Sequence, residues 1–153
     1  MAHGVLEVAE AAALNWQRPD LAAAAGWLSS LLAVSATDLG DHAAALVWCS
    51  DTERRARDGG RPGLLGWAAL TRSLIAWYQG DPMRSAEASR KGQAAGQPET
   101  AAYARLAAQE MRCATMLGDM AGMADAKRRA ADAMSALRPS VPASGALLDT
   151  GGR

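Results

Sequence analysis

The stretch Leu64–Pro82 (LLGWAALTRSLIAWYQGDP) combines a long apolar run with residues that end one helix and begin another. Four large apolar side chains recur at helical intervals and share one face: Trp67, Leu70, Leu74 and Trp77. Gly80 favours the left-handed backbone that closes a helix. Asp81 before Pro82 is a typical helix start, in which the carboxylate accepts free N–H groups and proline occupies the first turn. The stretch therefore predicts a helix, a tight corner and a second helix.

The same Gly-Asp pair follows two other helix-length runs. The pairs at Gly40, Gly80 and Gly118 lie 40 and 38 residues apart, and an alanine stands four positions before each glycine. Periods between about 20 and 50 residues are typical of solenoids, in which each repeat is one supersecondary unit. The chain is therefore predicted to be all-α, a stack of repeated antiparallel helix hairpins.

Apolar periodicity and turn residues together predict about seven helices. Their expected ranges are residues 4–17, 20–39, 42–58, 64–79, 82–95, 98–117 and 120–137. After Arg138 the chain has prolines and glycines without an apolar period, which is typical of disorder. We therefore expect one helical repeat domain over residues 1–137 and a disordered tail over residues 138–153.

Length, charge and cysteine usage restrict the class of protein. The 153 residues are half hydrophobic, which is enough for one domain with a real core. Sixteen basic and sixteen acidic residues cancel, so direct binding to nucleic acid is not expected. Cys49 and Cys113 are too far apart to suggest a disulfide scaffold or a zinc site. With no signal peptide and no run of about 18 uncharged apolar residues, we expect a soluble cytoplasmic protein away from membranes.

Residue patterns of known catalytic or metal sites are missing. His3 and His42 stand alone and are expected at the surface. The chain contains no HExxH motif, no glycine-rich phosphate loop and no Ser-His-Asp arrangement that helical periodicity would bring together. Basic clusters at residues 54–57 and 127–129 have acidic neighbours, as on a solvated outer helix face. We therefore predict no enzyme activity, no catalytic residue, no cofactor and no metal site.

The helix hairpins, the Gly-Asp corners and the small residues before them resemble the tetratricopeptide repeat family over residues 20–137. The period is longer than the 34 residues usual in that family, and its aromatic and proline landmarks are only partly kept. The resemblance implies a right-handed superhelical solenoid. It also implies that the first helix of each hairpin lines an inner groove.

Three stretches in order look like the C-terminal repeat region of bacterial transcriptional regulators that begin with an Xre-type helix-turn-helix domain. They are WLSSLLAVSATDLGDHAAALVWC, LIAWYQGDPMRSAEASR and EMRCATMLGDMAGMADAKRRA. The DNA-binding domain of such regulators does not precede them here. The resemblance therefore implies the sensory or regulatory half of a bacterial regulator, standing alone or truncated.

Helical spacing from the glycine corners predicts the residues that face the groove. They are Trp27, Ser30, Val34 and Thr37 from the first hairpin, Trp67, Leu70, Leu74, Trp77 and Tyr78 from the second, and Arg105, Ala108, Arg112 and Thr115 from the third. We hypothesise that a protein or peptide binds there, with apolar side chains on the tryptophans and a carboxylate near the arginines. The alternative is that the tryptophans belong to the core.

Two other functions remain open. A small-molecule sensor is the second choice, because an aromatic pocket enclosed by Trp67, Trp77 and Tyr78 suits an apolar ligand. A DNA-binding regulator is the third, since the resemblance points to regulators but their DNA-reading part is missing.

Position within the repeat also predicts one contact. Arg72 and Glu110 both stand eight residues before a corner glycine, on neighbouring first helices. We expect them to form an ion pair between repeats, the alternative being two independently solvated side chains.

The last predicted helix carries an apolar face that nothing after it covers. That face consists of Ala126, Ala130, Ala133, Met134 and Leu137. Solenoids need polar end caps. We expect cover from the tail through Leu147 and Leu148, from a second copy of the chain in a homo-oligomer, or from a repeat that has been lost.

Overall fold

The computed structural model describes residues 19–137, and this part of the chain consists of six α-helices without a β-strand. The helices are α2 (Pro19–Asp38), α3 (His42–Asp58), α4 (Pro62–Tyr78), α5 (Pro82–Ala95), α6 (Ala101–Leu117) and α7 (Met120–Leu137). The all-α prediction is confirmed. The helix predicted at residues 4–17 and the tail predicted at residues 138–153 lie outside the described residues.

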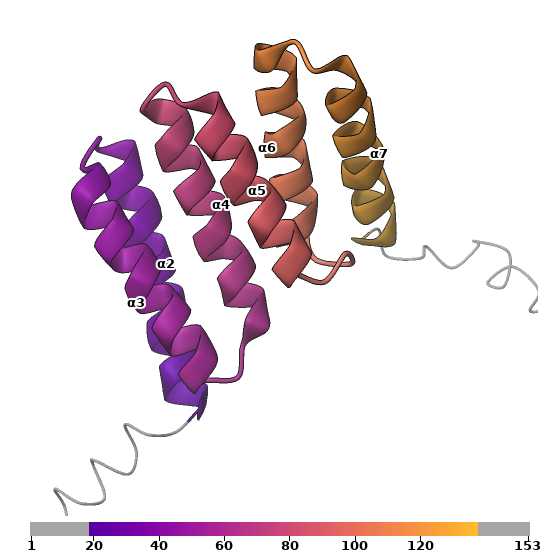
Figure 1. Ribbon diagram of the computed structural model, residues 1–153. Helices are drawn as coiled ribbons and strands as arrows, with labels where there is room; N and C mark the ends of the chain where they lie inside the picture. The colour runs from indigo at the N-terminus through magenta and orange to yellow at the C-terminus, as the bar shows by residue number, and fades with distance from the viewer. Residues whose placement is uncertain (1–18, 138–153) are drawn as a thin grey trace, which may run out of the picture.

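The helices form a row of antiparallel pairs, from α2 and α3 at one end to α6 and α7 at the other (Figure 1). Each helix contacts the next one in the chain, and α4 also contacts α2 and α6. The second helices of the pairs stand apart, because no Cα–Cα distance within 8 Å joins α3 to α5 or α5 to α7. One layer, α2, α4 and α6, is therefore continuous, and the other layer has gaps.

The three Gly-Asp pairs form equivalent corners. Gly40, Gly80 and Gly118 have φ angles of 78°, 79° and 72°, in the left-handed region that favours glycine. The N–H of each following aspartate donates to the carbonyl of the alanine four residues before the glycine, at 2.9–3.0 Å. Each aspartate side chain also accepts a backbone N–H of the next helix, from Ala44, Arg84 and Gly122. These observations confirm the predicted corners. The corners could be predicted because both hydrogen bonds are formed between residues close in sequence.

Two predicted helix starts are wrong. The sequence places the start of the fourth helix at residue 64, but α4 begins at Pro62, because proline suits the first turn of a helix. The sequence places the start of the sixth helix at Pro98, but α6 begins at Ala101. Thr100 is the N-cap, and its hydroxyl accepts the N–H of Tyr103. A threonine that accepts this free N–H starts a helix better than a preceding proline does.

Small side chains build most of the core. Ala33, Ala45 and Cys49 pack with Ile75 where α2, α3 and α4 meet, and all four are buried. In α5, a Cβ added at Gly92 would lie 2.7 Å from the Cβ of Ala69. Helices can approach this closely only where side chains are small.

Hydrogen-bonded polar groups fill the interior between α4, α5 and α6. The Ser73 hydroxyl lies 3.0 Å from the Ser85 hydroxyl and 2.7 Å from that of Ser89, and all three residues are fully buried. The amide of Gln109 and the thiol of Cys113 also donate to the Ser85 hydroxyl. Every buried side-chain nitrogen and oxygen in residues 19–137 has a partner, as stable burial requires.

The predicted ion pair between Arg72 and Glu110 is wrong. Arg72 donates to Glu53 of α3 at 2.8 Å. Glu110 is buried and accepts from Gln93 of α5 at 2.7 Å and from Arg129 of α7 at 3.0 Å. Equivalent positions in a repeat face equivalent surroundings, so both side chains contact the layer of α3, α5 and α7 instead of each other.

The apolar face predicted on the last helix is covered at two of its alanines and exposed at its two large side chains. Ala126 and Ala133 are 0% and 4% exposed, and the backbone of α7 packs against that of α6. Met134 and Leu137 keep 54% and 37% of their surface exposed. The buried alanines are small side chains that allow α7 to pack closely against α6.

One helix in residues 19–137, α2, is long and apolar enough by length and composition to cross a membrane. The expectation that composition excludes such a segment is therefore wrong for α2. The contacts of α2 are those of a packed helix, since Ser29 is buried and donates to Asp51 of α3. Core helices of soluble proteins and signal sequences pass the same test of length and composition, and 33% of the apolar window of α2 is buried.

Candidate functional site

Two tryptophans and an arginine meet across the continuous layer of helices. The ring centroids of Trp27 in α2 and Trp67 in α4 lie 6.5 Å apart, with their planes at 55°. Arg105 of α6 places its guanidinium carbon 5.6 Å from the centroid of the Trp67 ring. Tilted aromatic pairs at this separation and a cation over a ring are both attractive arrangements.

A second aromatic and cationic contact joins the same two helices further along. Arg112 of α6 lies over Trp77 of α4, with 4.2 Å from its guanidinium carbon to the ring centroid. We call Trp27, Trp67, Trp77, Arg105 and Arg112 the tryptophan–arginine surface. Five of the residues that the sequence placed in the groove therefore take part in two contacts between the first helices, one of three residues and one of two.

The residues predicted to face the groove divide into exposed and covered side chains. Exposed ones are Trp27, Val34, Tyr78, Arg105 and Arg112, whereas Trp67, Leu74 and Trp77 are half-buried. Trp27 keeps 49% of its surface exposed, so the alternative that it belongs to the core is wrong.

Three of the predicted groove residues belong to the interior instead. Leu70 is 7% exposed, and Ser30 and Thr37 are also buried, so placing them in the groove is wrong. Leu70 belongs to α4, which packs against both α2 and α6. Helical spacing gives the direction of a side chain but not how far the neighbouring helices reach over it.

Arg105 and Arg112 carry charge that no acid of the described chain neutralises. Within residues 19–137, no carboxylate lies within 4.0 Å of either guanidinium. A guanidinium stacked on a ring still presents N–H donors at its edge. The tryptophan–arginine surface therefore combines exposed apolar area with two available donors for a carboxylate.

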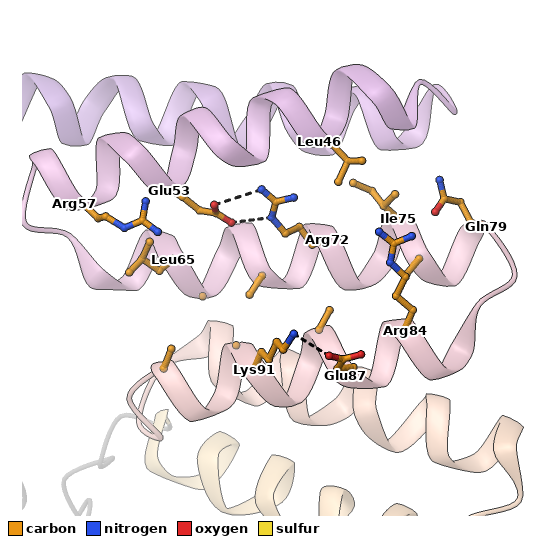
Figure 2. A pocket seen from close by; sticks show the side chains of 16 residues that line it. Leu46, Glu53, Arg57, Leu65, Arg72, Ile75, Gln79, Arg84, Glu87 and Lys91 are labelled. Atoms are coloured by element: carbon orange, nitrogen blue, oxygen red, sulfur yellow. Dashed lines mark hydrogen bonds and ion pairs between the residues drawn. The ribbon is translucent and has the colours of Figure 1, made fainter.

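A cavity that the sequence did not predict lies between α3 and α5, with α4 as its floor (Figure 2). Its volume is about 520 Å³. Apolar side chains of its lining include Leu46, Leu65, Ala69, Ile75 and Ala76, and its ionisable ones are Glu53, Arg57, Arg72, Arg84, Glu87 and Lys91. We call it the α3–α5 cavity. It occupies the gap that separates the second helices of the first two pairs.

Trp67, Trp77 and Tyr78, which were expected to enclose a pocket, do not line the α3–α5 cavity. Tyr78 is 56% exposed. The sequence signal that could have indicated the α3–α5 cavity is the set of small residues on the side of α5 that lines it, Ala88, Gly92 and Ala95.

Two ionisable groups outside the tryptophan–arginine surface, Asp51 and Cys49, belong to the packing of α3 against its neighbours. Although partial burial opposes ionisation of Asp51, hydrogen bonds from Ser29, Arg55 and Arg54 lower its pKa to about 2. Burial raises the pKa of the Cys49 thiol to about 11, against the opposing effect of Arg72. Within residues 19–137, no three His, Cys, Asp or Glu side chains come together as metal ligands would.

Comparison with protein-family models, with curated proteins and with solved structures finds no match for this chain. The function is therefore argued from the geometry of the described residues.

Proposed function

We propose that this protein is an interaction module of the tetratricopeptide type, whose helix pairs stack into a right-handed superhelical solenoid. The order of helix contacts supports this, because each first helix packs on both helices of the preceding pair. The equivalent corners at Gly40, Gly80 and Gly118 support it as well. A regular repeat of this kind presents its first helices along one surface.

The module binds a protein segment or peptide on the tryptophan–arginine surface. The observation that carries this proposal is the cluster of Trp27, Trp67 and Arg105, drawn from three helices that are far apart in sequence. Covering the exposed half of one tryptophan removes about 100 Å² from water, which is worth about 2–3 kcal/mol before ordering costs. Aromatic and arginine side chains are those that dominate binding energy in protein interfaces.

The partner carries apolar side chains next to a carboxylate. Arg105 and Arg112 are the groups that would hold the carboxylate, since a guanidinium binds it through two parallel hydrogen bonds. In the cell, we propose, the module is the sensory or regulatory part of a bacterial transcriptional regulator in the cytoplasm. It does not bind nucleic acid directly, because its charge is balanced.

Selection from a random peptide library tests this proposal. Selected peptides are expected to share aromatic or aliphatic residues beside an acidic one. Replacing both Arg105 and Arg112 by alanine is expected to weaken their binding by about tenfold to a hundredfold, measured by fluorescence anisotropy. The matched control replaces Arg54 of α3 and Arg128 of α7, two exposed arginines outside the surface.

Two results would contradict the proposal. One is a library that yields no specific peptide. The other is a set of peptides that bind the Arg105 and Arg112 double variant as tightly as wild type, provided that circular dichroism shows both proteins folded.

A homo-oligomer formed through α7 is a separate proposal. Met134 of α7 is exposed, so Met134→Lys tests this proposal by sedimentation.

A further inference from the structure

We propose that the α3–α5 cavity binds an elongated small molecule with an apolar chain and one carboxylate head, the head lying at Arg84. This site is distinct from the tryptophan–arginine surface and does not rest on the peptide-binding proposal. Its evidence is the position of the cavity, the charge of its lining and the arrangement of that lining.

The two sites lie on opposite faces of α4. At 100° per residue, Leu65, Ala69 and Ala76 project about 180° from the direction of Trp67 and Leu74. The first group lines the cavity, whereas Trp67 belongs to the tryptophan–arginine surface. Occupation of one site therefore does not block the other.

The apolar floor and the volume of the cavity suit an aliphatic chain. The floor consists of short and branched side chains along α4, between the two second helices. Its volume of about 520 Å³ lies within the range that small-molecule sites occupy. No Cα atoms of α3 and α5 lie within 8 Å of each other, and the cavity occupies the space between these two helices.

The lining carries more positive than negative charge. Glu53 is paired with Arg72, and Glu87 is paired with Lys91, each at 2.8 Å. Two further cations line the cavity, Arg57 and Arg84, and neither has a carboxylate within 4.0 Å in residues 19–137. The lining therefore complements an anion, and an apolar molecule without charge would leave these guanidinium groups unused.

The arrangement of the lining places the head of the ligand. In Figure 2 Arg84 and Gln79 lie toward one end of the cavity, and Arg57 and Leu65 lie toward the other. The Gln79 amide adds N–H donors to those of Arg84, so this end offers the larger set of partners to a carboxylate. From there the chain of the ligand runs along Ile75, Ala76 and Ala69.

Calorimetric titration with octanoate, decanoate and dodecanoate tests this inference, all below the concentrations at which they form micelles. We expect saturable binding of one molecule per chain, with affinity rising about fourfold for each added methylene group. Arg84→Gln is expected to weaken dodecanoate binding by about tenfold to a hundredfold. Decanol has a chain of the same length but no charge. Its affinity for the cavity is expected to be about tenfold to a hundredfold lower than that of decanoate.

Matched variants separate this site from other apolar surfaces. Ala88→Leu on α5 puts a larger side chain into the cavity and is expected to abolish binding, whereas Ala94→Leu on the exposed face of α5 leaves it unchanged. Arg105→Gln and Leu28→Gln alter the tryptophan–arginine surface and the exposed face of α2 and are also expected to have no effect.

Several results would overturn the inference. These are no binding, affinity independent of chain length, weaker binding in Arg57→Gln but not in Arg84→Gln, and loss of binding in Arg105→Gln or Leu28→Gln. Circular dichroism checks that each variant is folded. The peptide library gives an independent result, so failure of one proposal leaves the other standing.

Discussion

The guanidinium carbon of Arg112 in α6 lies 4.2 Å from the centroid of the Trp77 ring in α4. An exposed cation over an aromatic ring is worth about 0.5–1 kcal/mol. A double-mutant cycle with Arg112→Met and Trp77→Leu is expected to give a coupling free energy of this size, measured by urea unfolding. A coupling indistinguishable from zero would show that the arginine does not stack on the ring in solution.

The buried carboxylate of Glu110 joins three helices, because it accepts from Gln93 of α5 and Arg129 of α7. Glu110→Gln keeps the shape of the side chain but removes the charge. We expect unfolding free energy to fall by about 1–3 kcal/mol, since hydrogen bonds to charged groups are lost. Glu87→Gln, which breaks an exposed pair with Lys91, is the control and is expected to change stability much less. Equal effects of the two substitutions would contradict the assigned role.

Gly92 and Gly63 make a matched pair of helical glycines. A Cβ at Gly92 would lie 2.7 Å from Ala69 and 2.8 Å from Leu106, whereas nothing lies within 4 Å of a Cβ at Gly63. Gly92→Ala is therefore expected to destabilise the protein by about 1–3 kcal/mol. Gly63→Ala is expected to stabilise it by about 0.4–1 kcal/mol, because it restricts the unfolded chain. Chemical denaturation checks both, and a stabilising Gly92→Ala would show that α4 and α5 lie further apart.

Asp51 makes stability depend on pH in the acid range. Its folded pKa of about 2 lies below the model-peptide value of 3.8, so its contribution is fully present above about pH 4. That contribution is lost as the pH falls through about 2. The unfolding free energy of Asp51→Asn is therefore expected to fall less steeply than that of wild type over this interval.

Urea unfolding at several pH values measures the Asp51 effect. Ser29→Ala removes one of the hydrogen bonds to the carboxylate and is expected to give an intermediate slope. Identical slopes for wild type and Asp51→Asn would mean that the carboxylate is not held by Ser29, Arg55 and Arg54 in solution.

Helix corners could be predicted from the sequence because their causes are local. Gly80 needs only its own backbone freedom, and Asp81 reaches an N–H three residues away. The same short range explains the miss at α6, where Thr100 competed with Pro98 as the helix start. Residues of the tryptophan–arginine surface followed from helical spacing counted from these corners.

Contacts between helices could not be predicted in the same way. Arg72 has the length to reach several neighbours, and only the position of α3 decides that it pairs with Glu53. By helical spacing Leu70 points between Trp67 and Trp77, yet it is buried, in a helix that packs against both α2 and α6. Both outcomes depend on distances between helices, which no single helix encodes.

The amino-acid sequence by itself determined three features: the helical class of the described chain, the positions of its corners and the face of α4 that carries the large aromatic residues. Each of these depends on helix capping, on glycine φ angles or on the helical period, which act within a few residues. Tertiary structure alone decided which charged groups pair and where space remains. The α3–α5 cavity exists because small residues bring α4 close to α3 and α5 while those two helices stay apart, and that is a property of three helices packed together.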